Sequence, residues 1–459
     1  MFLIEKIPLD KVALISETGE RVTYSELEDL SDKIKHIFSH EKCLVVVLCD
    51  YTIETLKIYY ALLSCKAASL LLGDKTNISF ILNIVKEYRP KYLWIKSSFL
   101  QYFNDFDIIF SEGEHLLIKS HYELFPINPE LAVLLSTSGS TGNPKFVKLG
   151  FKNIYSNTLS VVETLGITPE SRLITTLPMN YSYGLTLVNM QLFVGGTILI
   201  TKKSIIDNEF WQFYMKEKPN VFAGVPQTYE HLDKLGFFAA KQPHLQHLTL
   251  AGGRVDFDIQ QKLSKGQEEN NYKVHIMYGQ TEASIISELP PNLISEKYGS
   301  VGLPIKNTKV SLKDNHPHGE LVVQSDSIFM GYALGYKELS LPNQINYIQY
   351  TGDTACLDED NCIYLKGRIT RYCKLAGIRV NLDDVEMLIK KHFKDIDVAC
   401  VDVENAMPVF YTGNYTEEEI KMFVSESINI YKGMICPVQV SEILRNERGK
   451  IQYHELKNL

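Results

Sequence analysis

Short apolar runs that alternate with amphipathic segments place the strongest constraint on the fold of this chain. Residues 43–49 and 67–72 are such runs, and they flank residues 52–63, whose spacing predicts a helix. The alternation returns between residues 172 and 278, where five short apolar runs are each bounded by Gly, Pro or Asn. Strands that alternate with helices form parallel or mixed sheets with helices on their faces. We therefore predict an α/β fold.

The end of the chain predicts a second, smaller domain. Residues 383–393 and 416–430 have the spacing of amphipathic helices, and residues 398–403 and 408–412 have the pattern of strands. These elements together predict a small α+β domain. A chain of 459 residues is also too long for one ordinary hydrophobic core, so two or three domains are expected.

Composition excludes several classes of function. The net charge is −8 and the Lys and Arg residues form no dense stripe, so nucleic acid and anionic membranes are not expected as partners. The eight cysteines form no C-x-x-C pair, which predicts reduced thiols. No signal peptide and no apolar run long enough to span a membrane are found. We therefore expect a cytoplasmic protein.

A loop rich in Ser, Thr and Gly is the first candidate for ligand binding. Residues 131–135 predict a buried strand, and S-T-S-G-S-T-G-N-P-K follows as residues 136–145. Its glycines let backbone N–H groups surround a polyphosphate, and Lys145 adds a positive charge. It is not a Walker loop, because Asn-Pro separates the last glycine from the lysine. A flexible linker is the alternative, but the strand before the loop and the amphipathic segment after it favour phosphate binding.

Two further motifs follow predicted strands, where open α/β sheets bind ligands. In A-G-G-R, residues 251–254, the two glycines would let a flat ring lie against bare backbone. In Y-G-Q-T-E-A, residues 278–283, Tyr278 offers an aromatic face, Thr281 a hydroxyl and Glu282 a carboxylate suited to Mg²⁺. Taken alone, A-G-G-R is best interpreted as a simple strand-to-helix turn, and a single Thr-Glu pair indicates no function. The occurrence of both motifs after the Ser/Thr/Gly loop is a specific combination.

Three charged residues near the end of the chain complete the pattern. Asp353, in Y-T-G-D, can accept two hydroxyl hydrogens of a ribose, and Arg368 can bind the ribose or a phosphate. Lys450 follows a glycine in E-R-G-K. Each residue alone has a simpler interpretation as a solvated surface charge.

In this order, the motifs resemble those of the adenylate-forming superfamily of acyl-CoA synthetases, peptide-synthetase adenylation domains and luciferases. The resemblance runs from about residue 23 to residue 450 and is closest to acyl-CoA and acyl-carrier-protein ligases. It implies ATP- and Mg²⁺-dependent conversion of a carboxylic acid to an acyl-adenylate, with release of pyrophosphate. Transfer to the thiol of CoA, or of the phosphopantetheine of an acyl or peptidyl carrier protein, would follow.

The resemblance also assigns residues to roles. Lys450, Thr281 and Glu282 would be catalytic, with Glu282 as the metal ligand. The ATP- or AMP-binding set would be Thr137, Ser138, Gly139, Ser140, Thr141, Gly142, Lys145, Gly252, Gly253, Arg254, Tyr278, Gly279, Gln280, Thr281, Asp353, Arg368 and Lys450.

The acyl pocket is assigned to L-P-M-N-Y-S-Y-G-L, residues 177–185. Its predicted residues are Tyr181, Ser182, Tyr183 and Gly184, together with Ala283. Ser182 stands where amino-acid-activating relatives usually carry an Asp that pairs with the α-ammonium of the substrate. A buried ammonium without such a partner is costly, so an acid without an α-amine is favoured. Tyr183 could equally be an ordinary core aromatic.

The resemblance places an interdomain hinge at Thr370, where relatives usually have Asp or Lys. It divides the chain into an adenylation domain, residues 1–368, and a mobile domain, residues 369–459, and it places Gly377 at the approach of the thiol arm. The proline and the arginine that often flank the catalytic lysine are missing, and Tyr453 stands in the place of the arginine. Two alternatives stay open: an amino-acid-adenylating ligase for a carrier protein, and a nucleotide-binding relative without ligase activity.

Overall fold

The computed structural model describes residues 7–39, 41–136, 145–313, 318–369, 371–375, 378–403, 406–428, 430–446 and 449–458. The chain forms two compact units. The first comprises Met1–Lys309 and Val323–Gln349, and the second comprises Val310–Val322 and Tyr350–Leu459. The second unit therefore takes in segments that precede residue 369, and the position of the hinge stays a prediction. Among the described residues, the structure contains no helix that is both long and apolar enough to cross a membrane.

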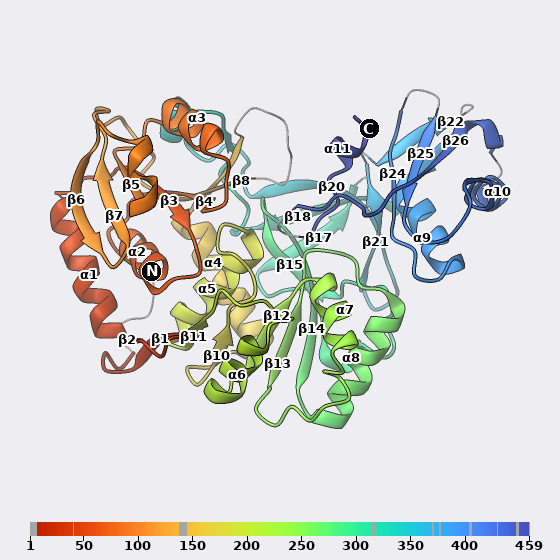
Figure 1. Cartoon of the computed structure of the whole chain (residues 1–459), viewed down its shortest axis with the longest axis horizontal. Helices are drawn as coiled ribbons and strands as arrows, with labels where there is room; N and C mark the ends of the chain where they lie inside the picture. Colours follow the sequence, from red (N-terminus) through yellow and green to blue (C-terminus); the bar gives the residue numbers. More distant parts are fainter. Residues whose placement is uncertain are drawn as a thin grey trace. The chain divides into compact units, whose positions relative to one another are not determined.

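A nine-stranded, mainly parallel sheet forms one half of the first unit. Its order is β16-β15-β14-β13-β12-β10-β11-β1-β2. The bounds are β1 (Val12–Ser16), β2 (Arg21–Thr23), β10 (Arg172–Ile174), β11 (Thr197–Ile200), β12 (Val221–Gly224), β13 (His247–Leu250), β14 (Lys273–Gln280), β15 (Ser284–Leu289) and β16 (Leu303–Pro304). Helices α6 (Asn208–Glu217), α7 (Pro226–Lys234) and α8 (Phe257–Asn270) belong to this half, and α7 and α8 pack beside β12 and β14 (Figure 1).

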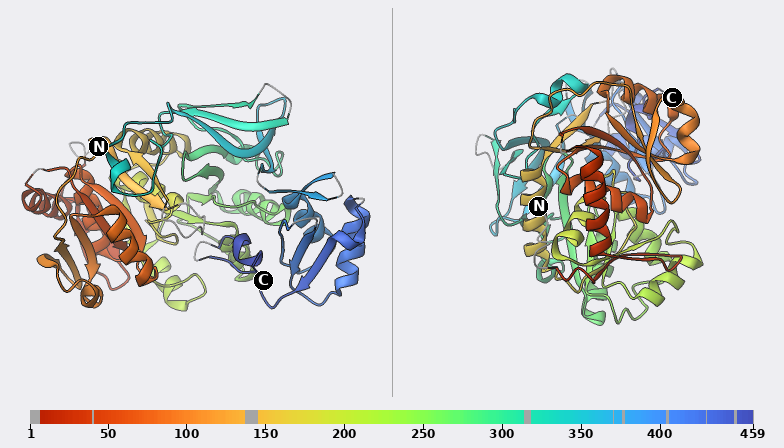
Figure 2. Two further views of the ribbon diagram at one scale, coloured as in Figure 1. Left: turned by 90° about the horizontal axis from the view of Figure 1, so that it is seen from above. Right: turned by 90° about the vertical axis from the view of Figure 1, so that its left-hand side faces the viewer.

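An eight-stranded sheet forms the other half of the first unit. Its order is β19-β9-β8-β4-β3-β5-β7-β6. The bounds are β3 (Leu44–Cys49), β4 (Ala68–Gly73), β5 (Tyr92–Lys96), β6 (Asp107–Glu112), β7 (His115–Lys119), β8 (Leu131–Ser136), β9 (Phe146–Gly150) and β19 (Tyr332–Ala333). Helices α2 (Ile53–Ser64) and α3 (Ile78–Tyr88) pack on these strands, and α1 (Tyr24–Ile37) packs against α2 (Figure 2). The further helices α4 (Phe151–Leu165) and α5 (Ser182–Val194) contact each other.

Local signals explain where the helices begin. The first helix starts at Tyr24 because Thr23 and Glu26 form a capping box, in which each side chain accepts a hydrogen bond from the other residue's backbone N–H. Thr52 caps α2 through the N–H of Thr55 in the same manner. The helix α2 lies where the apolar spacing predicts it, over residues 52–63.

The second unit contains a small α+β core. Three strands, β24 (Val398–Cys400), β25 (Met407–Tyr411) and β26 (Ile435–Gln439), form a sheet, and the mutually packed helices α9 (Leu382–His392) and α10 (Glu417–Ile428) cover it. The hairpin of β22 (Tyr372–Leu375) and β23 (Ile378–Asn381) precedes α9, and α11 (Tyr453–Leu456) ends the chain. A four-stranded sheet joins β17 (Thr308–Leu312), β18 (His318–Ser325), β20 (Ile348–Leu357) and β21 (Ile363–Arg368). The predicted fold class is confirmed.

One element near the candidate loop was missed by the sequence. The Ser/Thr/Gly loop leads from β8 into a second strand, β9, and α4 begins only at Phe151. The loop therefore joins two antiparallel strands. The pattern of β9 is hidden because Lys148 interrupts its apolar residues. This lysine is nevertheless fully buried, and its ammonium donates to Glu338 O and Gln344 Oε1 at 3.1 and 3.3 Å.

Candidate functional site

The candidate residues fall into two groups, one in each compact unit. Six residues of the Ser/Thr/Gly loop, Thr137 to Gly142, lie outside the described residues, as do Thr370 and Gly377. The two ends of the loop are described: Ser136 ends β8, and Lys145 precedes β9. Pairing of Ser136 with Phe146 across these strands fixes the loop's base.

Lys145 and Glu282, which come from two separate motifs, contact the same side chain. The ammonium of Lys145 lies 3.5 Å from the centre of the Tyr332 ring, a close cation–π contact. The Tyr332 hydroxyl donates a hydrogen bond of 2.9 Å to Glu282 Oε1. Burial, and next to it the charge of Glu282, raises the pKa of Tyr332, so this hydroxyl stays a donor at neutral pH. Tyr332 thus connects the phosphate-loop lysine to the candidate metal ligand.

Backbone pairing brings these three residues together. Tyr332 lies on β19, directly opposite Val147 of β9. The N–H of Phe329 donates to Glu282 O at 2.9 Å, which ties the segment before β19 to the Y-G-Q-T-E-A motif. The sequence motifs assigned Tyr332 no role. An aromatic residue in a short loop strand carries no signal of its own, because the contact depends on how β9 and β19 pair.

The Y-G-Q-T-E-A motif spans the end of β14 and the turn into β15. Tyr278, Gly279 and Gln280 are the last residues of β14, and Thr281 and Glu282 lie in the turn, half-buried. Gly279 is required there, because a Cβ atom would lie 2.1 Å from the carbonyl oxygen of Ser284. Ala283 is fully buried and is not among the residues that line the hollows described next, although it was assigned to the acyl pocket.

A hollow of about 260 Å³ lies at the carboxyl ends of β13 and β14. Its lining contains three predicted acyl-pocket residues, Tyr181, Ser182 and Tyr183, and two predicted nucleotide-binding glycines. The full lining is Tyr181, Ser182, Tyr183, Thr186, Ala251, Gly252, Gly279, Ser284 and Ile285. Gly252 has φ +91°, and a Cβ atom there would lie 2.4 Å from the Tyr181 hydroxyl.

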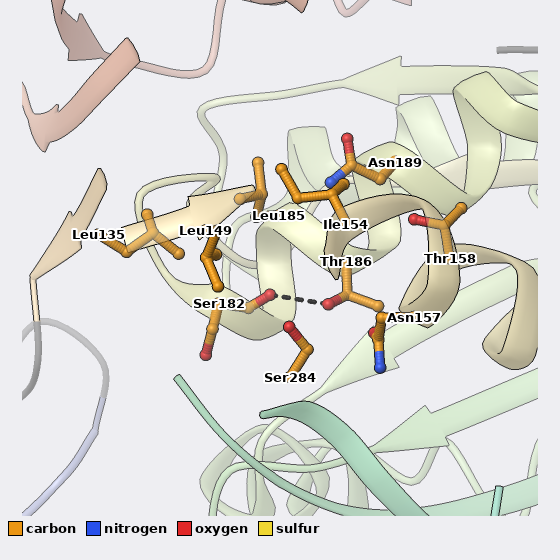
Figure 3. Close-up of a pocket in the computed structure, with 10 residues that line it drawn as sticks. All are labelled: Leu135, Leu149, Ile154, Asn157, Thr158, Ser182, Leu185, Thr186, Asn189 and Ser284. Atoms are coloured by element: carbon orange, nitrogen blue, oxygen red, sulfur yellow. Dashed lines mark hydrogen bonds between the residues drawn. The ribbon is translucent and has the colours of Figure 1, made fainter. Parts of the chain in front are cut away.

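A second hollow of about 260 Å³ shares Ser182, Thr186 and Ser284 with the first. Leucine and isoleucine side chains form one side, and the hydroxyl and amide groups of α4, α5 and Ser284 form the other (Figure 3). Its remaining lining residues are Leu135, Leu149, Ile154, Asn157, Thr158, Leu185 and Asn189. No lining residue of either hollow that the structure describes carries a charge.

The remaining residues predicted for the acyl pocket and the nucleotide site lie in the core or in turns. The Tyr183 hydroxyl is buried and donates to Thr249 Oγ1 at 2.7 Å, as expected for a core aromatic. Gly184 permits the close start of α5, since a Cβ atom would lie 2.2 Å from Pro178 O. Gly253 and Arg254 are exposed in the turn before α8. Burial raises the pKa of Tyr183, which keeps its hydroxyl protonated.

The second unit holds the predicted ribose pair. Asp353 and Arg368 lie opposite each other on the antiparallel strands β20 and β21. Arg368 Nε donates to Asp353 Oδ1 at 3.1 Å, with Asp353 buried and the arginine exposed. The backbone N–H of Gly352 is bound by Glu320 at 3.0 Å. Strand pairing therefore brings together two residues that the sequence could only name separately.

Lys450 lies in a tight hairpin of the second unit. Arg445 and Ile451 form an isolated antiparallel bridge, and Gln452 N–H donates to Leu444 O at 2.9 Å. Lys450 itself is bound at its backbone N–H by Asn446 Oδ1 at 3.0 Å. Gly449, which precedes it, has φ +70°, a conformation that favours glycine. Backbone contacts therefore link the residues before Lys450 to Lys450 itself and to the residues after it.

Comparisons with known proteins identify a family. The family of AMP-binding enzymes matches residues 4–333. A 2-succinylbenzoate–CoA ligase of Bacillus pumilus is 25% identical over 349 residues, which cover 73% of this chain and 70% of the relative. A ligase of the same name from Bacillus velezensis is 23% identical over 483 residues, covering 100% of this chain and 97% of the relative.

A solved structure has the same fold. O-succinylbenzoate coenzyme A synthetase from Bacillus subtilis, in complex with AMP, superposes with a TM-score of 0.79 at 22% identity, covering 98% of this chain and 95% of that one. The family model covers far more than half of the chain. The resemblance found in the motifs is therefore confirmed: this chain belongs to the family of AMP-binding enzymes.

Proposed function

We propose that this protein activates a carboxylic acid with ATP and Mg²⁺, and then transfers the acyl group to a thiol. Family membership supports the first step, and the CoA-ligase names of the relatives support CoA as the acceptor. The observation that carries the proposal is the contact of Lys145 and Glu282 with opposite parts of Tyr332. It brings a cation for phosphate and a carboxylate for Mg²⁺ to one place.

In the first step, a carboxylate oxygen of the acid attacks the α-phosphorus of ATP. The bond from that phosphorus to its bridging oxygen breaks, and pyrophosphate leaves. Negative charge grows on the phosphate oxygens, and we assign its neutralisation to Lys145, the loop N–H groups and Lys450. Mg²⁺ would supply further positive charge when bound. Glu282 fits such an ion, because Mg²⁺ prefers carboxylate oxygens and Tyr332 binds only Oε1 in the described contacts.

The two neutral hollows indicate the class of acid. Among their described lining residues there is neither a carboxylate for an ammonium nor a cation for a second carboxylate. A buried charge without a partner is costly. We therefore infer a monocarboxylic acid without an α-amine. The acid named for the relatives, 2-succinylbenzoate, carries two carboxylates, so we expect this chain to differ from them.

The proposed acceptor of the acyl group is a thiol. The thiol of CoA, or of a carrier protein's phosphopantetheine, would attack the acyl carbon and release AMP. Asp353 and Arg368 would bind the ribose of the nucleotide during both steps, and Gly377 would leave room for the thiol arm. CoA is the acceptor that the relatives' names support, and a carrier protein is the second candidate.

Pyrophosphate release tests the proposal. The purified protein is given ATP, Mg²⁺ and a panel of monocarboxylic, dicarboxylic and amino acids, and Lys450→Ala is measured beside it. We expect release with a monocarboxylic acid, reduced about 10²–10³-fold in the variant. Release with an amino acid would favour the carrier-protein ligase. Silence across the panel, with ATP bound, would favour a relative without ligase activity. CoA and a carrier protein are then compared as acceptors.

A further inference from the structure

Three residues to which the sequence assigned no function, Arg371, Glu386 and Tyr453, form a closed cluster in the unit that contains Lys450. Arg371 Nη2 lies 2.5 Å from Glu386 Oε1, and its guanidinium carbon lies 3.7 Å from the centre of the Tyr453 ring. The Tyr453 hydroxyl donates to the second oxygen, Glu386 Oε2, at 3.0 Å. Each of the three residues thus contacts the other two. The side chains of Arg371 and Glu386 are each 12% exposed.

Further contacts fix the cluster to the core of the second unit. Arg371 Nε donates to Asp383 Oδ1 at 2.8 Å, and Nη1 donates to Cys400 O at 2.7 Å. The backbone N–H of Cys400 donates to Glu386 Oε1 at 2.7 Å. The guanidinium and the carboxylate are therefore satisfied by both the helix α9 and the strand β24.

The positions of these residues in the chain show which two segments the cluster connects. Tyr453 is three residues beyond Lys450 and begins α11, whose Leu456 is buried against Ala399 and Phe410. Arg371 directly follows the predicted hinge residue, Thr370. The cluster therefore joins the segment after the hinge to the segment after the lysine.

The opposite end of the hairpin is held in a matching way. Arg445 binds both oxygens of Asp397, at 2.9 and 2.7 Å, and its other guanidinium nitrogen donates to Gly449 O at 3.0 Å. Lys450 thus lies between two anchors: Arg445 with Asp397 before it, and Tyr453 with Arg371 and Glu386 after it. Arg445 makes both contacts with Asp397 through the single nitrogen Nη2, and the stacking of Arg371 on the Tyr453 ring fixes the plane of its guanidinium.

We propose that Tyr453 and Arg371 are positioning residues for Lys450, and that they make the lysine hairpin and the segment after the hinge move as one piece. This inference rests on the proposed adenylation activity for the role of Lys450. A lysine on a loose hairpin would spend little time at the phosphate, and small misplacements of a reacting group cost up to about 10²-fold in rate. Neither residue touches the substrate in this account.

A double-mutant cycle with pyrophosphate release distinguishes positioning from general destabilisation. Tyr453→Phe keeps the ring under Arg371 and removes the bond to Glu386; Tyr453→Ala removes both contacts. We expect adenylation to fall about 10-fold in the first and about 10²-fold in the second, with the KM for ATP unchanged. In a Lys450→Ala background, both substitutions should cost nothing more, because their effect acts through the lysine. Losses that multiply instead would overturn the proposal.

Hydrogen exchange gives a readout that does not depend on activity. The backbone N–H groups of Lys450 and Gln452 should exchange about 10-fold faster in Tyr453→Phe, because the hairpin opens more often. Tyr431→Phe is the matched control, since that tyrosine is 73% exposed in the same unit. If wild type releases no pyrophosphate, the proposed function fails while this exchange still decides whether Tyr453 holds the hairpin. Unchanged exchange in both Tyr453 variants would contradict the inference.

Discussion

Each compact unit contains a tyrosine with a cation on its ring and a glutamate at its hydroxyl. In the first unit these are Lys145, Tyr332 and Glu282, at 3.5 and 2.9 Å. In the second they are Arg371, Tyr453 and Glu386, at 3.7 and 3.0 Å. The corresponding distances in the two clusters are similar, but only in the second cluster do the cation and the glutamate also contact each other.

The two clusters differ in ion pairing and in exposure of the charged side chains. Arg371 is paired directly with Glu386, and both are nearly buried. Lys145 is exposed, and it forms no ion pair with Glu282, although both residues are described. We propose that the opposite charges of the first cluster are available to a substrate and a metal, whereas Arg371 and Glu386 in the second neutralise each other. A basic residue, a tyrosine and a glutamate would then serve chemistry in one unit and rigidity in the other.

Neutralising the two glutamates should separate these roles most strongly. We expect Glu282→Gln to lower adenylation about 10²–10³-fold, because a charge that acts in the transition state is lost. Its free energy of unfolding should change by less than about 0.5 kcal/mol. Glu386→Gln should instead destabilise the protein by about 2 kcal/mol, because the buried Arg371 keeps Asp383 but loses one charged hydrogen-bond partner. Pyrophosphate release measures the adenylation rate, and urea unfolding measures the free energy of unfolding. If Glu282→Gln mainly lowered stability and Glu386→Gln mainly lowered the rate, the proposed difference between the two clusters would be wrong.

Removing the Tyr332 hydroxyl should have a smaller, metal-dependent effect. Tyr332→Phe keeps the ring under Lys145 but leaves Glu282 without its donor. We expect the Mg²⁺ concentration for half-maximal pyrophosphate release to rise about 10-fold, as for other residues that orient a metal ligand. Tyr336→Phe, a nearby tyrosine outside both clusters, is the control. A fall in rate that excess Mg²⁺ does not restore would argue against this role.

The smallest effect concerns alkaline pH. Burial, and next to it the charge of Glu386, raises the pKa of Tyr453. The folded protein then keeps a proton that the unfolded chain loses above pH 10, so the stabilisation is complete below pH 10 and is lost above it. The stability difference between wild type and Tyr453→Phe should be constant from pH 7 to about 9.5 and then fall by at most about 1.4 kcal/mol per pH unit. Urea unfolding measures it, and a difference that already falls near pH 8 would contradict the burial of this hydroxyl.

The sequence predicts the contiguous parts of the site and misses the contacts between distant segments. Asp353 and Arg368 are recognisable because each lies in a short motif, and the structure adds that they are cross-strand partners. Tyr332 carries no such signal, and Tyr453 is recognisable only as the residue in the place of the arginine that often flanks the lysine. Their partners lie far away in the chain, and only the pairing of β9 with β19 and the packing of α9 and α11 bring them together.

The missed strand β9 has a similar physical cause. A buried lysine breaks the apolar pattern, and its acceptors, Glu338 and Gln344, come from a distant segment. The functional roles of the motif residues, the hinge at Thr370 and the domain boundary after residue 368 remain predictions.

Isotope transfer tests the central claim most directly. The acid identified by pyrophosphate release is prepared with ¹⁸O in both carboxylate oxygens and incubated with ATP, Mg²⁺ and CoA. If an acyl-adenylate forms, the oxygen that joins the acyl carbon to the α-phosphorus comes from the acid, and thiol attack leaves it on AMP. We therefore predict one ¹⁸O atom in each AMP, measured by mass spectrometry. Label in inorganic phosphate beside unlabelled ADP would contradict adenylation.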